Sequence, residues 1–131
     1  EALSEIDGVT FRHVPEGGVE NYSFVNFFLP SESFAQKAHK ALADAGVDAC
    51  FYWYKNNWHY INGWEHLRDQ NSLGPLSSEI KSQMQDLNKA DFSKSDAWMG
   101  RTVSSLVKIG WTETQVRERA EAMKKAIASV L

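Results

Sequence analysis

Residues 22–29 read YSFVNFFL and form the clearest strand signal in this chain. Aromatic and β-branched residues favour an extended backbone, and Pro30 ends the strand because it has no backbone N–H to donate. A helix follows directly. Ser33 and Gln36 have the spacing of a capping box, and apolar residues recur at helical spacing as far as Ala45. We therefore predict a strand followed at once by a helix that ends at Gly46.

Three further strands and one further helix complete the expected sheet. The alternating stretch 9–14 predicts a strand before the first one, and residues 47–54 and 102–109 predict two strands after it. Thr112 and Gln115 form a second capping pair before the last helix. Tight turns and single helices between strands favour a small, mostly antiparallel sheet with helices packed on one face. The predicted fold class is α+β.

The region between residues 56 and 95 carries weaker signals. Short helices are plausible at 64–69 and 77–87, a loop at 91–95 and a helical turn at 97–100. Length and composition suit one domain over residues 1–131. The first residues look like the last turn of a helix that stops at Gly8. They fit either a chain cut from a longer protein or a short helix of an independent domain.

Composition excludes several functional classes. A net charge of −3 gives no broad positive field, so we expect no nucleic-acid partner. No apolar run reaches the roughly 20 residues that span a bilayer, so we expect no membrane partner. The opening EALSEIDG lacks the layout of a signal peptide, and the single Cys50 cannot form an internal disulfide. These features favour a cytoplasmic location.

An aromatic segment marks the candidate site. Residues 51–66 read FYWYKNNWHYINGWEH, in which rings alternate with amide and imidazole groups. Trp53 stands at the end of a predicted strand, and Asn57 and His59 follow it. Flat rings stack on the apolar faces of a sugar, whereas amides bond its hydroxyl groups, so the segment suits a polyhydroxylated or carboxylated ligand. The alternative is that these rings are core residues.

Residues for catalysis are scarce. No glycine-rich phosphate loop follows a strand, and the histidines lack the spacing of metal ligands, so we predict no metal site and no catalytic residue. A nucleophilic pair of Cys50 and His59 ranks last, because nothing near Cys50 in the sequence lowers its pKa. Arg101 and Lys108 flank the last strand and are candidates to bind a carboxylate or phosphate, although solvation is the usual role of such residues.

Four stretches together resemble a known family. The stretches are FVNFFLP (24–30), DAGVD (44–48), FYWYKNNWHY (51–60) and SDAWMGRTVSSLVKIGWTETQV (95–116). They resemble the C-terminal small domain of sugar aminotransferases of pyridoxal-phosphate fold type I, the DegT-like group. Within that group the chain looks most like the amino-octulosonate transaminases, which place an amino group on an eight-carbon sugar acid of lipopolysaccharide.

The resemblance implies a substrate-side role. In such enzymes a large N-terminal domain holds pyridoxal phosphate and supplies the Schiff-base lysine, and the small domain contributes a wall of the substrate cleft. The matching substrate-binding positions are Trp53, Asn57, His59, Arg101 and Lys108. The chain alone would then bind no cofactor and be inactive, as a fragment or stand-alone remnant whose partner is the missing large domain.

A non-enzymatic role is the alternative. A binding or dimerisation module could reuse the same fold. Apolar area that a large domain would cover must then be buried elsewhere, and a second copy of the chain is the simplest cover. This alternative predicts a homodimer.

Overall fold

The computed structural model describes residues 2–56 and 59–131 and shows an α+β fold, as predicted. In chain order the elements are η1 (Ala2–Glu5), β1 (Thr10–Phe11), β2 (Phe24–Phe28), α1 (Glu32–Asp44), β3 (Cys50–Phe51), η2 (Trp53–Lys55), η3 (Ile61–Gly63), α2 (Glu65–Arg68), α3 (Ser78–Gln83), η4 (Leu87–Lys89), α4 (Ser93–Met99), β4 (Thr102–Leu106) and α5 (Glu113–Ala128), where η marks a short 3₁₀-helix.

The strands form one antiparallel sheet in the order β1-β2-β4-β3. The central pair, β2 and β4, places Asn26 opposite Ser104 and Val25 opposite Ser105. Beside β4, Phe51 of β3 also lies opposite Ser104. Since side chains alternate between the two faces of a sheet, Asn26, Ser104 and Phe51 share one face, and Val25 and Ser105 share the other.

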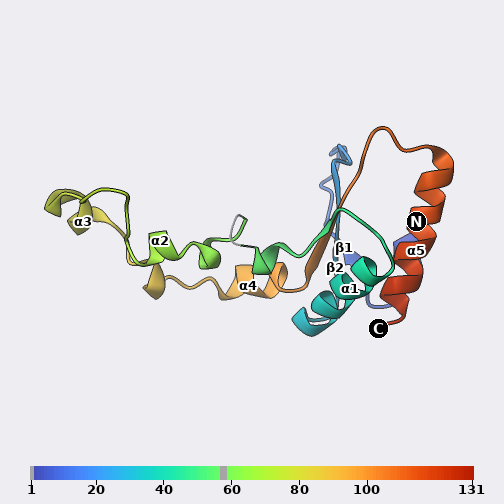
Figure 1. Ribbon diagram of the computed structural model, residues 1–131, viewed down its shortest axis with the longest axis horizontal. Coiled ribbons are helices and arrows are strands. Elements are labelled where there is room, and N and C mark those ends of the chain that lie inside the picture. The colour runs from blue at the N-terminus through green and yellow to red at the C-terminus, as the bar shows by residue number, and fades with distance from the viewer. Residues whose placement is uncertain (1, 57–58) are drawn as a thin grey trace.

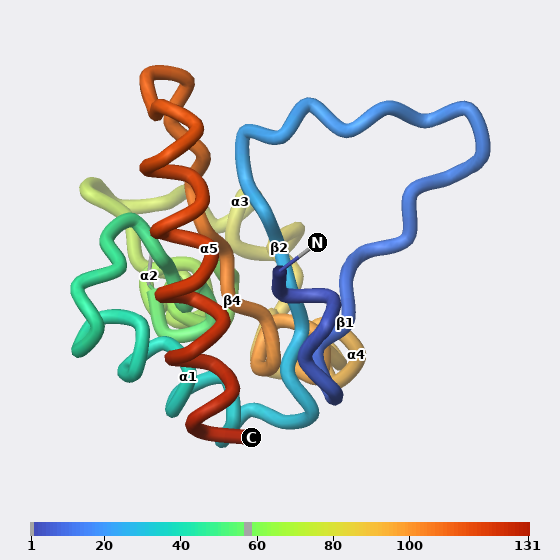
Figure 2. The backbone as a smooth tube through the Cα atoms, turned by 90° about the vertical axis from the view of Figure 1, so that its right-hand side faces the viewer, coloured from blue at the N-terminus to red at the C-terminus, as the bar shows by residue number. Residues whose placement is uncertain are grey.

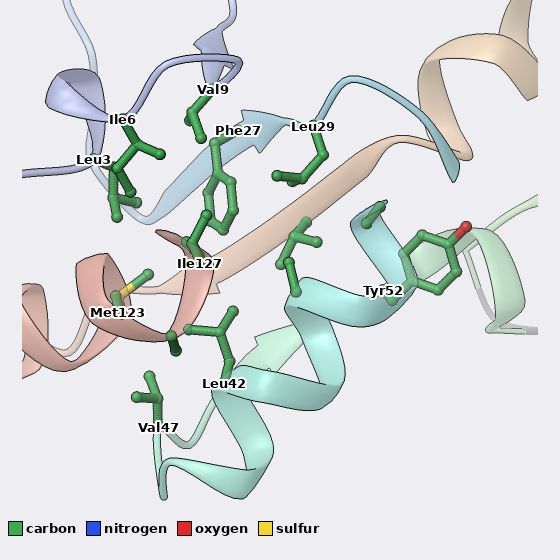
Figure 3. Close-up of a cluster of buried hydrophobic side chains, with 14 residues drawn as sticks. Leu3, Ile6, Val9, Phe27, Leu29, Leu42, Val47, Tyr52, Met123 and Ile127 are labelled. Carbon is green, nitrogen blue, oxygen red and sulfur yellow. The ribbon is translucent and has the colours of Figure 1, made fainter. Parts of the chain in front are cut away.

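Helices α1 and α5, with η1, cover the second of these faces and enclose the core (Figures 1 and 3). Phe27 of β2, Leu42 of α1, Val103 of β4 and Ile127 of α5 have no exposed surface. Burial of a side chain of this size contributes about 1.5–3 kcal/mol. We call the opposite face of the sheet the open face, because neither α1 nor α5 covers it.

The N-cap of α5 agrees with the one predicted from the sequence, whereas the N-cap of α1 differs. Thr112 and Gln115 form the predicted capping box, with the side chain of each bonded to the backbone of the other. At α1 the N-cap is Ser31 rather than the predicted Ser33. The Gln36 amide donates instead to the Glu32 carboxylate at 2.8 Å, so it makes no capping box with Ser33.

The two later strands are shorter than predicted. β3 has only two residues, and the chain then turns into η2, so Trp53 stands in a 3₁₀-helix rather than at a strand end. β4 ends at Leu106, so Lys108 lies beyond the strand and does not interrupt it. The predicted loop at 91–95 is partly helical, because α4 begins at Ser93.

Two segments extend from the sheet. Residues 65–90 form an arm that reaches away from α1 and α5 and carries α2 and α3 (Figure 1). The connection between β1 and β2 swings out as a wide loop (Figure 2). The first described element, η1, and the C-terminal end of the chain lie beside α5 (Figure 1). Lys124 of α5 pairs with Glu5 of η1. Among the described helices, none has the length and apolar character needed to cross a bilayer.

Candidate functional site

The open face of the sheet carries a groove of about 520 Å³. Strands β2 and β4 form its floor, η2 supplies one wall and α4 supplies the other. Its lining residues are Arg12, Phe24, Asn26, Phe28, Trp53, His59, Trp98, Met99, Thr102 and Ser104. Most of the lining is aromatic or apolar, with a few polar groups among the rings. That mixture is typical of a small-molecule site.

The η2 wall is a set of stacked rings. Trp53 lies parallel to Phe51 with ring centroids 4.5 Å apart, and Phe24 meets both of these rings edge-on. The His59 ring lies 4.0 Å from that of Trp53. Trp53 and His59, both predicted as site residues, are therefore brought together. The packed rings give the groove an apolar wall against which the C–H groups of a sugar can pack.

The α4 wall is built around Trp98. Its ring meets Phe28 edge-on at 5.0 Å, and the Arg101 guanidinium lies 4.1 Å from the Trp98 ring centroid. Arg101 itself lines a second hollow of about 750 Å³, shared with Glu32 and Asp96. Arg101, a predicted site residue, therefore stacks on the Trp98 wall of the groove and also lines the neighbouring hollow.

The floor of the groove holds a polar pair made of the buried Ser104 and the half-buried Asn26. The Ser104 hydroxyl donates to the Asn26 side-chain oxygen at 2.6 Å across the β2–β4 pairing, and Ser104 is 1% exposed. This bond orients the amide, so that the Asn26 N–H groups face away from Ser104. An oriented amide in an aromatic groove can donate to a ligand hydroxyl or carboxylate.

A hydrogen-bond network attaches α4 to the aromatic segment. The Tyr60 hydroxyl and the Asn62 amide both donate to Asp96 Oδ1, at 2.6 Å and 2.8 Å. Burial and then the Asp96 carboxylate raise the pKa of Tyr60, so its hydroxyl stays protonated as a donor. The Tyr52 hydroxyl donates to the Gly100 carbonyl at 2.7 Å. These bonds fix the distance between the two walls of the groove.

Arg101 precedes β4, whereas Lys108 follows the other end of the strand. Lys108 is not among the groove residues. Its ammonium pairs with Asp48 at 2.7 Å, and Arg119 pairs with the same carboxylate at 2.7 Å. Hydrogen bonds from Lys108 and then Arg119 lower the pKa of Asp48. Lys108 is thus part of a surface ion-pair group. Asn57, the remaining predicted site residue, lies outside the described residues.

Cys50 and His59 do not form a nucleophilic pair. Cys50 lies opposite Ser105 on the helix-covered face, whereas His59 lines the groove on the open face. Burial raises the pKa of the Cys50 thiol above its usual value, which disfavours the reactive thiolate. The sheet separates the two groups.

Sequence reasoning missed Arg12, Asn26, Ser104 and Trp98 as groove residues. A signal was present for Asn26, because one amide in the apolar run FVNFF stands out, and alternation places it with Phe24 and Phe28 on one face. Ser104 and Trp98 carried no comparable signal, since the strand pairing brings them to the groove.

No metal centre is found within residues 2–56 and 59–131, where no three His, Cys, Asp or Glu side chains are placed to hold an ion together. A search of the sequence against models of known protein families finds no match.

Proposed function

We propose that the open face of the sheet is one wall of a cleft that binds a sugar acid. In this proposal the chain is the substrate-side C-terminal domain of a pyridoxal-phosphate-dependent sugar aminotransferase and is inactive alone. The observation that carries the proposal is the groove, where stacked rings stand beside an oriented amide. The resemblance of four stretches to the small domain of such enzymes supports the choice of family.

The groove suits the two kinds of surface that a sugar presents. Its flat C–H faces can pack against the ring stack in which Phe51 and His59 lie on either side of Trp53. Its hydroxyl groups can accept from the Asn26 amide, which Ser104 orients. A ligand of this kind gains affinity from walls that are already fixed before it binds.

The groove residues do not fit pyridoxal phosphate itself. None of the described lining residues is a lysine, so none can form a Schiff base with the cofactor. In this proposal the cofactor and its lysine belong to the large domain, and the open face is the surface that contacts that domain. A cytoplasmic location completes the proposal and is supported by the single unpaired Cys50.

Titration with a deoxyoctulosonic acid, followed by ligand-observed NMR, tests the proposal. We expect saturable binding that Trp53→Leu weakens by about tenfold, equivalent to about 1.4 kcal/mol. The matched control is Trp111→Leu, because Trp111 is absent from the groove residues and stacks on Arg119 instead. We expect it to change affinity by less than about twofold.

Two results would contradict the proposal. Equal loss of affinity in both tryptophan variants would show that the groove is not the binding site. An absorbance band from pyridoxal phosphate linked to one particular lysine of this chain would contradict its inactivity alone. Absence of sugar binding, together with a concentration-dependent dimer in light scattering, would favour the dimerisation module instead.

A further inference from the structure

A guanidinium group at the edge of the groove is already bound to a carboxylate. Arg12 follows β1 directly and lines the groove. Its Nε donates to Glu20 Oε1 at 2.8 Å, and its Nη2 donates to Glu20 Oε2. Two parallel bonds of this type are the geometry in which arginine recognises any carboxylate. Glu20 comes from the same β1–β2 connection, so the chain supplies its own acid to this position.

The pair is charged and accessible. Arg12 is 51% exposed in its side chain, whereas Glu20 is 19% exposed. The hydrogen bond from Arg12 lowers the pKa of Glu20, so the carboxylate stays ionised near neutral pH. An exposed ion pair of this kind contributes little to stability. Breaking the pair therefore costs the folded chain little, so a second carboxylate can compete with Glu20 for Arg12.

The rest of the groove provides a place for the neutral part of such a ligand. The Asn26 amide and the Trp53 ring line the same groove as Arg12. A sugar acid could thus lie with its ring against the stack that contains Trp53 and its carboxylate toward Arg12. A neutral sugar would use the same rings and amide without disturbing Glu20.

Resting on the proposed function, we propose that Glu20 occupies the position of the ligand carboxylate on Arg12 while the groove is empty. Arg12 is then the residue that selects acidic over neutral sugars, and Glu20 is its internal competitor. Binding exchanges one carboxylate for another at the same guanidinium. The exchange also frees the β1–β2 connection, whose ends the pair holds together.

The structure offers a matched control for both charges. On α5, Arg117 pairs with Glu113, both side chains are largely exposed, and neither lines the groove. Arg12→Gln and Glu20→Gln can therefore be compared with Arg117→Gln and Glu113→Gln, which make the same chemical change elsewhere. Circular dichroism checks that every variant is folded.

The test compares a deoxyoctulosonic acid with its neutral methyl ester by calorimetric titration of the whole chain. We expect the chain to bind the acid about tenfold more tightly than the ester, equivalent to about 1.4 kcal/mol. Arg12→Gln should remove this preference by weakening only the acid. Glu20→Gln should tighten the acid severalfold and leave the ester unchanged, and the two α5 variants should behave as the unmodified chain.

The outcomes separate this inference from the proposed function. Equal affinities for acid and ester, with both reduced by Trp53→Leu, would overturn the role of Arg12 and leave the sugar site standing. An Arg12→Gln variant that keeps the preference for the acid would overturn it as well. Absence of binding of either ligand to the folded chain would overturn both proposals.

Discussion

Tyr52 joins the aromatic segment to the start of β4 through one buried hydrogen bond. Its residue surface is 9% exposed, and its hydroxyl donates to the Gly100 carbonyl at 2.7 Å. Burial disfavours the charged phenolate and raises the pKa of Tyr52 to about 12. Both walls of the groove therefore depend on a tyrosine that must remain protonated.

The raised pKa predicts a loss of stability at high pH. An unfolded tyrosine titrates near pH 10, so between about pH 10 and about pH 12 the folded state binds more protons than the unfolded state. The contribution of Tyr52 is therefore complete below about pH 10 and is lost as pH rises toward about 12. Urea unfolding across this range should show a falling free energy of unfolding, with a shallower slope in Tyr52→Phe.

The same variant has a second expected effect at neutral pH. Tyr52→Phe should lower the free energy of unfolding by about 1–3 kcal/mol, because the Gly100 carbonyl loses its donor. Tyr22→Phe is the control, since Tyr22 is 64% exposed. Its free energy of unfolding at neutral pH should stay within about 0.5 kcal/mol of that of the unmodified chain. Identical slopes in the unmodified chain and Tyr52→Phe would refute the role of Tyr52.

Individual elements show which parts of the fold the sequence predicts. The start of α5 is set by Thr112 and Gln115 alone, and the prediction is confirmed. The predicted N-cap of α1, Ser33, is wrong by two residues, because Ser31 caps the helix and the Gln36 side chain bonds Glu32 instead. Local spacing could not decide between two serines that both favour an N-cap.

The groove also shows that local sequence signals do not predict which residues far apart in the chain come together. Trp53 and His59 were predicted together because they are close in the sequence. Asn26 and Ser104 meet only through the β2–β4 pairing, 78 positions apart. Which strands pair, and in which register, depends on the packing of the whole sheet. The sequence therefore predicted an aromatic ligand site, but it did not identify all the residues that line the groove.

The capping box of α5 predicts the effect of one substitution. Thr112→Ala removes the acceptor for the Gln115 N–H and should lower the free energy of unfolding by about 1 kcal/mol. Thr114→Ala makes the same chemical change inside α5 and is the control, because alanine favours a helix interior. Denaturant titrations of both variants measure the difference. Equal destabilisation by the two changes would argue against the cap.

The arm is held by hydrogen bonds between its own two sides, and these bonds do not involve the helical layer. The Arg68 Nε donates to the Asn88 side-chain oxygen at 3.1 Å, and the Asn88 amide donates to the Arg68 carbonyl at 2.9 Å. These bonds join the two sides of the arm near its base. Beyond them the chain reaches outward (Figure 1), with residues such as Leu73 fully exposed.

The part of the arm beyond Arg68 and Asn88 is therefore expected to be dispensable for folding. Replacing residues 70–86 by Gly-Gly should leave the melting temperature within about 4 °C of the original, because the chain is already closed by Arg68 and Asn88 and shorter loops lose less entropy. Affinity for the sugar acid should also stay within about twofold. Asn88→Ala in the shortened chain is the control for the closing bonds. Loss of a cooperative transition on shortening would show that the arm supports the core.

The placement of the two chain ends has a practical consequence. The first described element, η1, and the C-terminal end of the chain lie on the helical layer (Figure 1), whereas the residues that line the groove belong to the opposite face of the sheet. A tag or fluorescent label fused at either end would therefore stand clear of the ligand. Attached to a sensor surface by such a tag, the molecule would present its aromatic groove to the flowing solution.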